Sequence, residues 1–568
     1  MRWKFREHEA PPPPGDLGGL ADSMDISPRL ARFLWQRGLR SRGDLSAFLN
    51  PSLRGLAPLD AWPGLRQAAA LLAEGLLQGK KLCIWGDYDV DGISAAALML
   101  EFLRAHGLDA ACRIPDRLSE GYGLNIPGIA AAARQGAEIL LTVDCGIADN
   151  EAAAYARSLG MTVIITDHHL SSGALPAADA IVNPRLLPCP CPSLSGVGVA
   201  FFLAAALNAE LAAAGKGRVD VRKLLDLVAL GTLADVVDLN GQNRILVKNG
   251  LLQLACGARV GLAALKAACN FSPGAMLGAG QVVFALTPRI NAAGRLGSGE
   301  TALDLLLTRD RAAAAALAAE LSRLNSARRE EENRIYREAV LQAEEQAGAG
   351  RSGLVLFAPD WHTGVVGIVA ARVAEKLHRP TIVLSEIKAK LKGSGRSVPG
   401  FDLHDALQAC SGLLLGYGGH KAAAGLSLRA EELDAFREAF HAAVLERQGE
   451  TPPEAECRID GELSFAEADF DFLKELEMLQ PFGEGNDEPL FASPPVNVKK
   501  MHTRNGFTAL EVQEEKGGPT RTAKIWRRPP GLRNAVEGKR IRIAYTPRID
   551  RYNGAAAVEL RLKDWKEL

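Results

Sequence analysis

Residues 81–92 of the chain are KLCIWGDYDVDG, residues 138–146 are EILLTVDCG and residues 162–169 are TVIITDHH. Each stretch runs from apolar, β-prone residues into acidic ones, and helix-favouring, Ala-rich sequence follows it. This alternation predicts repeated strand–helix units of a parallel sheet. In such sheets, ligands bind beyond the carboxyl ends of the strands. We therefore expect the three acidic strand ends to meet in one crevice.

The three strand ends carry five carboxylates and two imidazoles. These side chains are Asp87, Asp89, Asp91, Asp144, Asp167, His168 and His169. So many carboxylates in one crevice would repel one another strongly unless divalent cations neutralised their charge. The pattern therefore predicts a metal site at this edge of the sheet.

Two of the acidic motifs also allow a structural interpretation. The acidic triplet in DYDVDG resembles the start of an EF-hand, but the Glu that such a loop needs about seven residues further on is missing. A solvated turn is the ordinary interpretation of an isolated triplet, and the recurrence of acids after two further strands argues against it. Asp144 could instead cap the helix expected from about Asn150, although Asp149 is the better candidate for that cap.

The DHH triplet supplies the nitrogen ligands. We favour His168 as a direct metal ligand, with Asp167 and His169 orienting it or reaching the substrate. Asp235, in ADVVD at residues 234–238, follows an apolar helix and is a weak candidate when taken alone.

Composition bounds the class of protein. A chain of 568 residues is long enough for three or four domains. Its 66 Lys and Arg nearly balance 67 Asp and Glu, so any polyanion must be held by local basic patches. Nine cysteines without a framework spacing favour a reduced, cytoplasmic enzyme. We find no secretory pattern at the start and no apolar run long enough to span a bilayer, so we expect no membrane partner.

Five segments can be distinguished along the chain. They are an N-terminal appendage of short helices (1–60), an α/β catalytic domain (61–308), one long solvated connecting helix (309–347), a second α/β lobe closed by glycine-rich turns (348–450) and a small all-β barrel or sandwich (451–568). In the first α/β domain, we expect strands at residues 82–86, 111–114, 139–143, 163–166 and 180–182.

The motifs DYDVDG, VDCG, DHH and ADVVD, in this order and spacing, resemble the four motifs of the DHH phosphoesterase superfamily. Later segments are similar to the RecJ family of single-strand-specific exonucleases, and they are LTPRINAAGRLG (286–297), SGRS (394–397), GYGGHKAAAG (416–425) and QPFGEGNDEPLF (480–491). The resemblance covers nearly the whole chain. It implies a DHH domain with a parallel sheet, a DHH-associated α/β domain joined to it by a long helix, and a C-terminal OB-fold.

The resemblance also implies a set of site residues. Two Mn²⁺ or Mg²⁺ ions would be held by Asp89, Asp91, Asp144, His168 and Asp235, with Asp87 nearby and Asp144 as the bridge, while His169 and His420 would assist catalysis. Substrate would be bound by Arg117, Arg289, Asn291, Arg295, Ser394, Arg396, Gly418, Gly419 and His420. Surface ion pairs for the arginines and a structural turn for the glycines are the alternatives.

The activity that follows from the resemblance is metal-dependent 5′→3′ hydrolysis of single-stranded DNA to mononucleotides, in DNA repair and recombination. A single-strand-binding protein and a recombination helicase would be the protein partners. The barrel offers residues suited to a single strand, namely His502, Arg504, Phe507, Lys524, Trp526, Arg527, Arg528, Arg548, Arg551 and Tyr552. A phosphodiesterase for short oligonucleotides or cyclic dinucleotides is one alternative. A noncatalytic strand-binding scaffold is another, although such scaffolds tend to lose metal ligands and all are present here.

Overall fold

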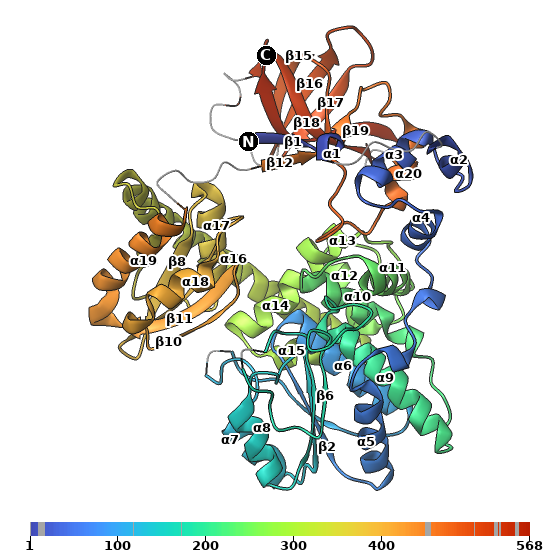
Figure 1. The fold of residues 1–568 in the computed structure, drawn as a ribbon, viewed down its shortest axis with the longest axis vertical. Coiled ribbons are helices and arrows are strands. Elements are labelled where there is room, and N and C mark those ends of the chain that lie inside the picture. Colours follow the sequence, from blue (N-terminus) through green and yellow to red (C-terminus); the bar gives the residue numbers. More distant parts are fainter. Residues whose placement is uncertain are drawn as a thin grey trace.

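The computed structural model describes residues 2–9, 17–117, 119–171, 173–448, 456–504, 506–526, 532, 536–550 and 556–568. They form an α/β body at the base, a second α/β lobe beside it, and a β-barrel above the two (Figure 1). The fold class predicted from the sequence is confirmed.

The base is built on a five-stranded parallel sheet with strand order β3-β2-β4-β5-β6. The strands are β2 (Leu82–Gly86), β3 (Ala111–Arg113), β4 (Ile139–Val143), β5 (Thr162–Thr166) and β6 (Ala180–Val182). All five predicted strands are present, with ends that differ by at most one residue. β2 and β4 are buried along their whole length because helices cover both faces of the sheet.

Helices pack on the two faces of this sheet as the alternation of strand side chains requires. On one face lie α5 (Leu65–Leu77), α6 (Val90–Ala105) and α9 (Gly196–Ala213), whose apolar residues share a core with Ile84 and Leu141. On the other face lie α7 (Ile126–Arg134) and α8 (Asn150–Ser158), which pack with Trp85 and Leu140. In its length and apolar composition, α9 would suit a membrane span, but two thirds of it is buried inside the fold, as in a core helix.

A helical layer extends this body toward the second lobe. It consists of α10 (Leu225–Ala234), α11 (Gly241–Ala255), α12 (Val260–Ala268), α13 (Ala279–Gln281), the π-helical η4 (Val282–Leu286), α14 (Thr287–Leu296) and α15 (Gly299–Leu307). These helices place Asp235 at the end of α10 and Arg295 in the last turn of α14.

The connecting helix is α16 (Arg311–Gly348), and it matches the long helix predicted at residues 309–347. The expectation that this helix is solvated holds for one face only. Leu321 and Leu324 pack toward the base, whereas Ile335 packs with the second lobe. The dense charges of its middle are compatible with this packing because they pair with one another, as Arg334 does with Glu331 at 2.8 Å.

The second lobe contains a five-stranded sheet of order β10-β11-β9-β8-β7. Its elements are β7 (Leu354–Phe357), α17 (Val366–Leu377), β8 (Thr381–Ile387), β9 (Lys390–Arg396), α18 (Leu403–Ala409), β10 (Gly416–Gly419), β11 (Ala423–Arg429) and α19 (Leu433–Gln448). The glycine-rich segments expected to be turns are strands instead, since SGR ends β9 and GYGG forms β10. A side chain at Gly393 would collide with the backbone of Val383 on the neighbouring strand, so glycine is needed there for pairing.

The free edge of β7 is bonded to two glutamines of α16. The side chain of Gln346 donates to the carbonyl of Val355 at 2.8 Å and accepts from the amide of Val355 at 3.1 Å. Gln342 makes the same pair of bonds with Phe357, at 3.0 and 3.1 Å. The connecting helix is therefore bound to the second lobe through main-chain groups as well as apolar side chains.

The C-terminal segment forms a closed barrel in which β18, β15, β16, β17 and β19 follow one another and β19 pairs again with β18. The strands are β13 (Gly461–Glu462), β14 (Phe491–Ala492), β15 (Val496–Arg504), β16 (Phe507–Glu514), β17 (Arg521–Ile525), β18 (Arg540–Asp550) and β19 (Ala557–Glu567). Helix α20 (Phe470–Met478) precedes β14 and joins the barrel core.

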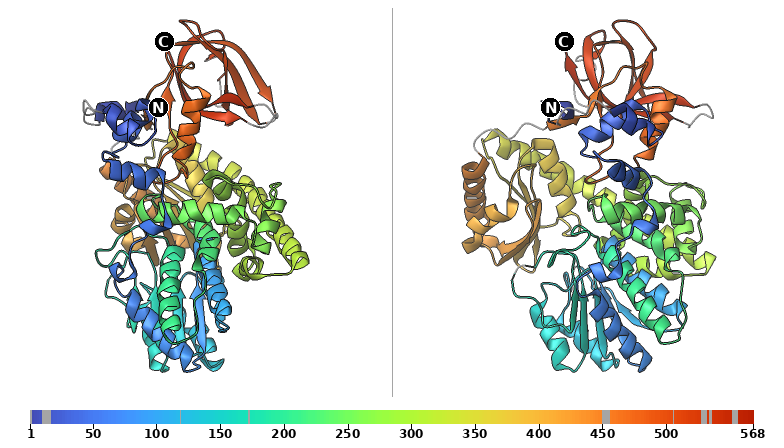
Figure 2. Two further views of the ribbon diagram at one scale, coloured as in Figure 1. Left: turned by 90° about the vertical axis from the view of Figure 1, so that its right-hand side faces the viewer. Right: turned by 45° about the vertical axis from the view of Figure 1, so that its right-hand side comes forward.

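The N-terminal segment packs on this barrel, although the barrel is formed by the other end of the chain (Figure 2). β1 (Arg2–Phe5) pairs in parallel with β12 (Glu456–Ile459). Helices α2 (Leu17–Asp22), α3 (Pro28–Gln36) and α4 (Arg42–Leu49) share one hydrophobic core with the barrel and α20. We call the described residues of 2–49 and 456–568 together the terminal module.

Candidate metal centre

The carboxyl ends of the parallel strands bring the predicted ligands together. Ligating atoms lie within 4.8 Å of one another in each of three sets, which are Asp87 with Asp89 and Asp144, Asp91 with His168 and Asp235, and Asp144 with His168 and His169. Asp144 occurs in two of the sets, and the ends of β2, β4 and β5 meet the end of α10 there. Asp235, a weak candidate by sequence alone, joins the cluster.

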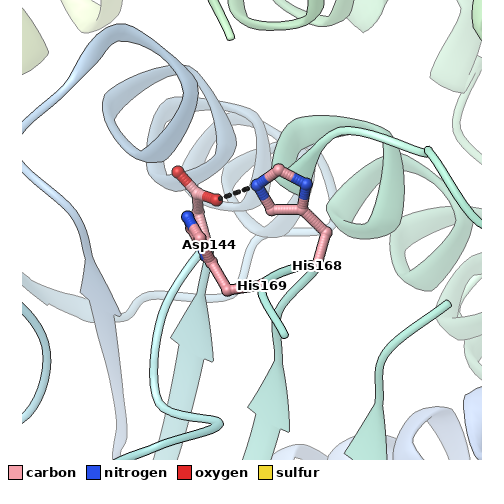
Figure 3. Close-up of side chains that lie close together, drawn as sticks. All are labelled: Asp144, His168 and His169. Carbon is pink, nitrogen blue, oxygen red and sulfur yellow. Dashed lines mark ion pairs between the residues drawn. The ribbon is translucent and has the colours of Figure 1, made fainter. Parts of the chain in front are cut away.

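His168 lies at the middle of the cluster. Its Nε2 atom is 3.1 Å from Oδ1 of Asp144, 3.5 Å from Oδ2 of Asp235 and 4.0 Å from Oδ2 of Asp91. Figure 3 shows the imidazole of His168 directed at the carboxylate of Asp144, with His169 beside them. Burial and the positive charge of His169 lower the pKa of His168 to about 3, so its imidazole is neutral and can act as a ligand.

Several buried polar atoms of the cluster have no hydrogen-bond partner among the described residues. They are Oδ1 of Asp87, Oδ1 of Asp144, both ring nitrogens of His168 and Oδ2 of Asp235. Buried polar atoms are nearly always paired, so a group of unpartnered atoms gathered in one place indicates a missing partner. Carboxylate and imidazole donors suit Mn²⁺, and carboxylates suit Mg²⁺, so the residues fit divalent cations.

Helix N-termini orient two of the carboxylates. Asp89 is the N-cap of α6, and its Oδ1 atom accepts hydrogen bonds from the amides of Asp91 and Gly92 at 2.9 and 3.1 Å. Asp91 accepts from the amides of Gly196 and Val197, in the first turn of α9, at 2.7 and 3.1 Å. These amide donors hold negative charge at fixed positions.

Three glycines make room for the carboxylates. A side chain at Gly92 would clash with Asp87, one at Gly196 with Asp144, and one at Gly231 with Asp91. Sequence reasoning missed Gly196 and Gly231. The only signal was the pair of glycines in SGVGVA at the start of an otherwise apolar helix, which resembles an ordinary helix start.

Four carboxylates of the cluster hold protons more tightly than an exposed Asp does when no cation is present. Burial, followed by the charge of neighbouring carboxylates, raises the pKa of Asp91 to about 7 and that of Asp235 to about 9. The same causes raise the pKa values of Asp87 and Asp144 well above the ordinary value. Cations that bind here would displace these protons.

His169 and Asp167 form a supporting pair beside the cluster. Asp167 accepts from the amides of His168 and His169, and its carboxylate is 2.8 Å from Nδ1 of His169. The Tyr122 hydroxyl lies 3.0 Å from the same ring nitrogen. Burial opposes the charge on His169, but the hydrogen bond and charge of Asp167 outweigh it and raise the pKa of His169 to about 9. Asp149, expected as a helix cap, occupies the cap position of α8 but accepts from the amide of Leu124 instead.

The second lobe presents His420 in the exposed turn between β10 and β11. The turn is closed by a hydrogen bond of 2.8 Å from the amide of His420 to the carbonyl of Ala423. Burial, and then the positive charges of His169 and Arg185, lower the pKa of His420. His420 therefore lies close enough to His169 and Arg185 for their charges to act on it. Gly418 and Gly419 lie in β10, and Gly419 has a φ of 136°, which favours glycine.

Arginines from both bodies gather between the base and the second lobe. Burial and the charges of Arg117, Arg328 and Arg396 lower the pKa of Arg295 to about 9, and Arg295 donates to the carbonyl of Gly364 at 2.8 Å. In the part of the chain that the structure describes, no carboxylate forms an ion pair with Arg295, so this arginine is not the surface ion pair that the sequence also allowed. Arg328 pairs with Glu332 at 2.9 Å, whereas Arg396, like Arg295, has no ion pair with a carboxylate among the described residues. A group of like charges with so few carboxylates favours the binding of an anion.

Ser394 and Arg396 lie over the first turn of α17. A side chain at Gly367 would come within 3.2 Å of Oγ of Ser394 and 3.1 Å of Nη2 of Arg396. The guanidinium of Arg289, by contrast, is bonded to Ser322 and to the carbonyl of Ala285. Asn291 lies half-buried on α14 with Arg289 and Arg295.

Sequence reasoning missed Arg328 and Asn325, which α16 contributes to this region. The Nε atom of Arg328 and the Oδ1 atom of Asn325 are buried without partners among the described residues. The dense charges of this helix indicated a solvated face and gave no sign that Arg328 points inward.

The barrel residues have mixed surroundings. Trp526 is 54% exposed, and its ring centroid is 5.2 Å from that of Phe507. Lys524 pairs with Glu559 and Asp550, Arg548 with Glu488, and His502 with Glu511. Arg527, Arg528, Arg551, Tyr552 and the side chain of Arg504 lie outside the described residues.

Family models match three parts of the chain. The N-terminal domain of the DHH family matches residues 81–232, the DHHA1 domain matches residues 350–446, and the RecJ OB domain matches residues 459–564.

Relatives match the chain over nearly its whole length. The single-stranded-DNA-specific exonuclease RecJ of Dickeya dadantii is 38% identical over 563 residues, which cover 96% of each chain. RecJ of Thermus thermophilus in complex with Mn²⁺ superposes with a TM-score of 0.85 at 32% identity, covering 100% of this chain and 80% of that one. The same protein in complex with Mg²⁺ gives a TM-score of 0.78 at 32% identity, with coverage of 100% and 78%. The chain therefore belongs to the RecJ family of single-stranded-DNA-specific exonucleases.

Proposed function

We propose that the protein is a metal-dependent exonuclease that degrades single-stranded DNA from its 5′ end to mononucleotides. The observation that carries this proposal is the cluster of unpartnered ligand atoms on Asp87, Asp144, His168 and Asp235, beside an arginine-rich site whose Arg117 lies over the ring of Tyr88, the residue after Asp87. A phosphodiester needs both parts, because cations act on the scissile phosphate and arginines hold a neighbouring one.

The proposed metal ligands are Asp87, Asp89, Asp91, Asp144, His168 and Asp235, with Asp144 shared between two Mn²⁺ or Mg²⁺ ions. Cations bound here would lower the pKa of a water molecule and neutralise the negative charge that develops on the oxygens around phosphorus. The protein positions these ligands through the amides of α6 and α9, so the carboxylates need little reorganisation when a cation binds.

His420 from the second lobe and His169 from the base both act on the substrate. His420, with its lowered pKa, is neutral near pH 7 and donates one N–H to a non-bridging phosphate oxygen. His169 is protonated at the same pH and is held by Asp167, so it presents positive charge to the phosphate.

The arginine site sets the polarity of the reaction. Arg117, Arg295, Ser394 and Arg396 bind the terminal 5′ phosphate, while Arg289 and Asn291 contact the strand nearby. A terminal phosphate carries more negative charge than an internal one and fits a site with several unpaired guanidinium groups. Gly418 and Gly419 let the strand approach the backbone of β10 closely.

The barrel guides a long single strand toward the metal centre, and the rings of Trp526 and Phe507 are surfaces on which nucleobases stack. The proposed setting is the cytoplasm, in DNA repair and recombination, with a single-strand-binding protein and a recombination helicase as partners.

The test is digestion of end-labelled single strands of both polarities, with a duplex control, in Mn²⁺ or Mg²⁺. We expect mononucleotides to be released from the 5′ end of single strands only. Release from the 3′ end, or equal digestion of the duplex, would contradict the proposal. A preference for dinucleotides over long strands would instead indicate a phosphodiesterase for short oligonucleotides.

A further inference from the structure

The terminal module is attached to the base through helix α11. Two cationic side chains lie one helical turn apart on α11, and they are Arg244 and Lys248. Both donate hydrogen bonds to carbonyl oxygens of the terminal module. Arg244 is 2% exposed, and its Nε atom donates to the carbonyl of Phe48 at 2.8 Å. Its Nη2 atom donates to the carbonyls of Leu479 and Gln480 at 3.0 and 3.1 Å.

Lys248 completes this arrangement with a donation to the carbonyl of Leu49 at 2.9 Å and to that of Met478 at 3.4 Å. Leu49 is the last residue of α4, and Met478 is the last residue of α20. The C-terminal carbonyls of a helix lack partners within the helix and carry partial negative charge. The two cations of α11 therefore hold the C-terminal ends of two helices, one from each end of the chain.

The geometry around Arg244 leaves little freedom. The guanidinium carbon lies 3.7 Å from the centre of the Phe48 ring. Burial lowers the pKa of Arg244 to about 10, and burial together with the charge of Arg244 lowers that of Lys248 to about 8. A buried cation that lost its carbonyl partners would be left without compensation, so the module cannot shift on α11 without a large loss of stability.

A turn of the motif QPFGEGNDEPLF provides a second attachment. The amide of Leu239 donates to the carbonyl of Glu484 at 2.8 Å, and Nδ2 of Asn240 donates to the carbonyl of Gly485 at 3.0 Å. The turn is closed by paired hydrogen bonds between Gly483 and Asn486. Gly485 has a φ of 69°, and a side chain there would meet Asn240 and Asp238.

This second attachment lies close to the metal centre in the chain. Leu239 and Asn240 follow Asp235 by four and five residues and lead directly into α11. The segment that carries a proposed metal ligand is thus the segment on which the module is docked.

We propose that Arg244 and Lys248 are positioning residues that hold the terminal module in one place relative to the metal centre, so that a strand leaving the barrel reaches that centre. The turn of the motif QPFGEGNDEPLF reinforces the same attachment. This inference rests on the proposed exonuclease function. We infer that the attachment of the module affects the cleavage of long strands, and that it plays no part in the chemistry at the phosphate.

The test compares two substrates of one enzyme. One is a 5′-phosphorylated trinucleotide, and the other is a 5′-phosphorylated single strand of about 40 nucleotides, longer than the ~4–16 that an OB-fold covers. For the double variant Arg244→Met with Lys248→Met, we expect kcat/KM on the long strand to fall about tenfold or more, as the loss of one stacked base would produce. We expect kcat/KM on the trinucleotide to stay within about twofold, and small-angle scattering to show a larger radius of gyration.

Lys266→Met is the matched control. Lys266 is also a fully buried cation bonded to three carbonyls, but its acceptors, on Leu254, Pro273 and Ala275, all lie in the base. This variant should lose stability and keep the wild-type ratio of long-strand to trinucleotide activity. If it lowered the ratio as the double variant does, general destabilisation would explain the effect and the proposal would fall.

Gly485→Ala disturbs the same attachment while both cations stay in place. This variant replaces the double variant in the test if the double variant does not fold. We expect it to lower the ratio in the same direction. Equal losses on both substrates, or a larger radius of gyration with an unchanged ratio, would overturn the proposal. A wild-type protein that cleaves neither substrate would contradict the exonuclease function itself, which is a separate result.

Discussion

The Nε2 atom of His168 lies 3.1 Å from the Oδ1 atom of Asp144, yet neither atom has a hydrogen-bond partner among the described residues. The two atoms are close without being bonded, as expected of two ligands that share a third atom. Because both side chains are buried, this arrangement is costly unless a cation occupies the space between the ligands.

Replacing Asp144 with Asn keeps the shape of the side chain and removes its charge. We expect Mn²⁺-dependent release of nucleotides from a 5′-phosphorylated single strand to fall by at least about a hundredfold, since even groups behind the ligands affect activity 10–100-fold. The measurement is the initial rate with purified protein at saturating Mn²⁺. Asp149→Asn is the control, because Asp149 is partly buried nearby and bonds the amide of Leu124 outside the cluster. Unchanged turnover in Asp144→Asn would rule out a metal-bridging role.

Stability without metal should depend on pH through the cluster. The pKa values of Asp91, about 7, and Asp235, about 9, lie above the ordinary value of 3.8, so the folded protein binds more protons than the unfolded chain between these limits. The free energy of unfolding therefore falls as pH rises from about 4 to 9. With a chelator present, we expect the melting temperature to fall between pH 6 and pH 9, and Mn²⁺ to raise it most at pH 9. Asp235→Asn should make the melting temperature depend less on pH. If the melting temperature of this variant, measured with a chelator, fell with pH as steeply as that of the wild type, this assignment would be contradicted.

Gly196→Ala should damage the metal centre without unfolding the protein. The added methyl group would collide with the carboxylate of Asp144. We expect a loss of activity of about a hundredfold, comparable to the loss of a ligand contact, and a weaker rise of melting temperature on addition of Mn²⁺. Gly280→Ala is the matched control because a side chain at Gly280 meets nothing within 4 Å. Equal activity in the two variants would show that Gly196 does not shape the site.

The arginine site should discriminate between strand ends. Arg396→Gln removes one guanidinium, and we expect cleavage of a 5′-phosphorylated strand to fall about tenfold or more, consistent with the loss of a charge-assisted hydrogen bond. Cleavage of a 5′-hydroxyl strand should change much less. Arg437→Gln, which alters an arginine bonded to Asp434 and to the carbonyl of Val355, is the control on the same lobe. Equal losses on the two strand ends would argue against binding of the terminal phosphate.

The N-terminal helices should be needed for the stability of the barrel. Phe33 of α3 is 4% exposed, and its ring centroid is 6.1 Å from that of Phe491 in β14. We expect Phe33→Ala to lower the free energy of unfolding by about 3–5 kcal/mol, as for other buried aromatic residues. Chemical unfolding monitored in the barrel is the measurement. Arg32→Ala, which alters an exposed residue of the same helix, should change stability little.

Much of the base could be predicted because its signals are local. A run of five residues of which four are apolar, such as residues 139–143, followed by Asp144, indicates a buried parallel strand with a functional residue at its end. The rule that parallel strands place ligands at their carboxyl ends then brings Asp144 and His168 together without any coordinates. Asp235 was weak by sequence because its place depends on the packing of α10 and not on a strand end.

Features that depend on distant contacts could not be predicted in this way. The GYGG segment has the composition of a turn, and only pairing with β11 and the close packing at Gly393 make strands of this region. Arg328 has the same local surroundings as the exposed charges on α16, so its inward direction depends on the two bodies that flank the helix. The packing of α3 and α4 on the barrel joins residues more than 400 positions apart, and nothing in the local pattern indicates it.

The bonds from Gln342 and Gln346 to β7 have a consequence for the protein in concentrated solution. β7 is the last strand of its sheet, and an uncovered edge strand is a template on which another chain can add a strand. The two glutamines occupy the outward amides and carbonyls of Val355 and Phe357. The connecting helix thus protects the second lobe against edge-to-edge aggregation, and replacing both glutamines with alanine would expose a four-residue apolar strand to self-association.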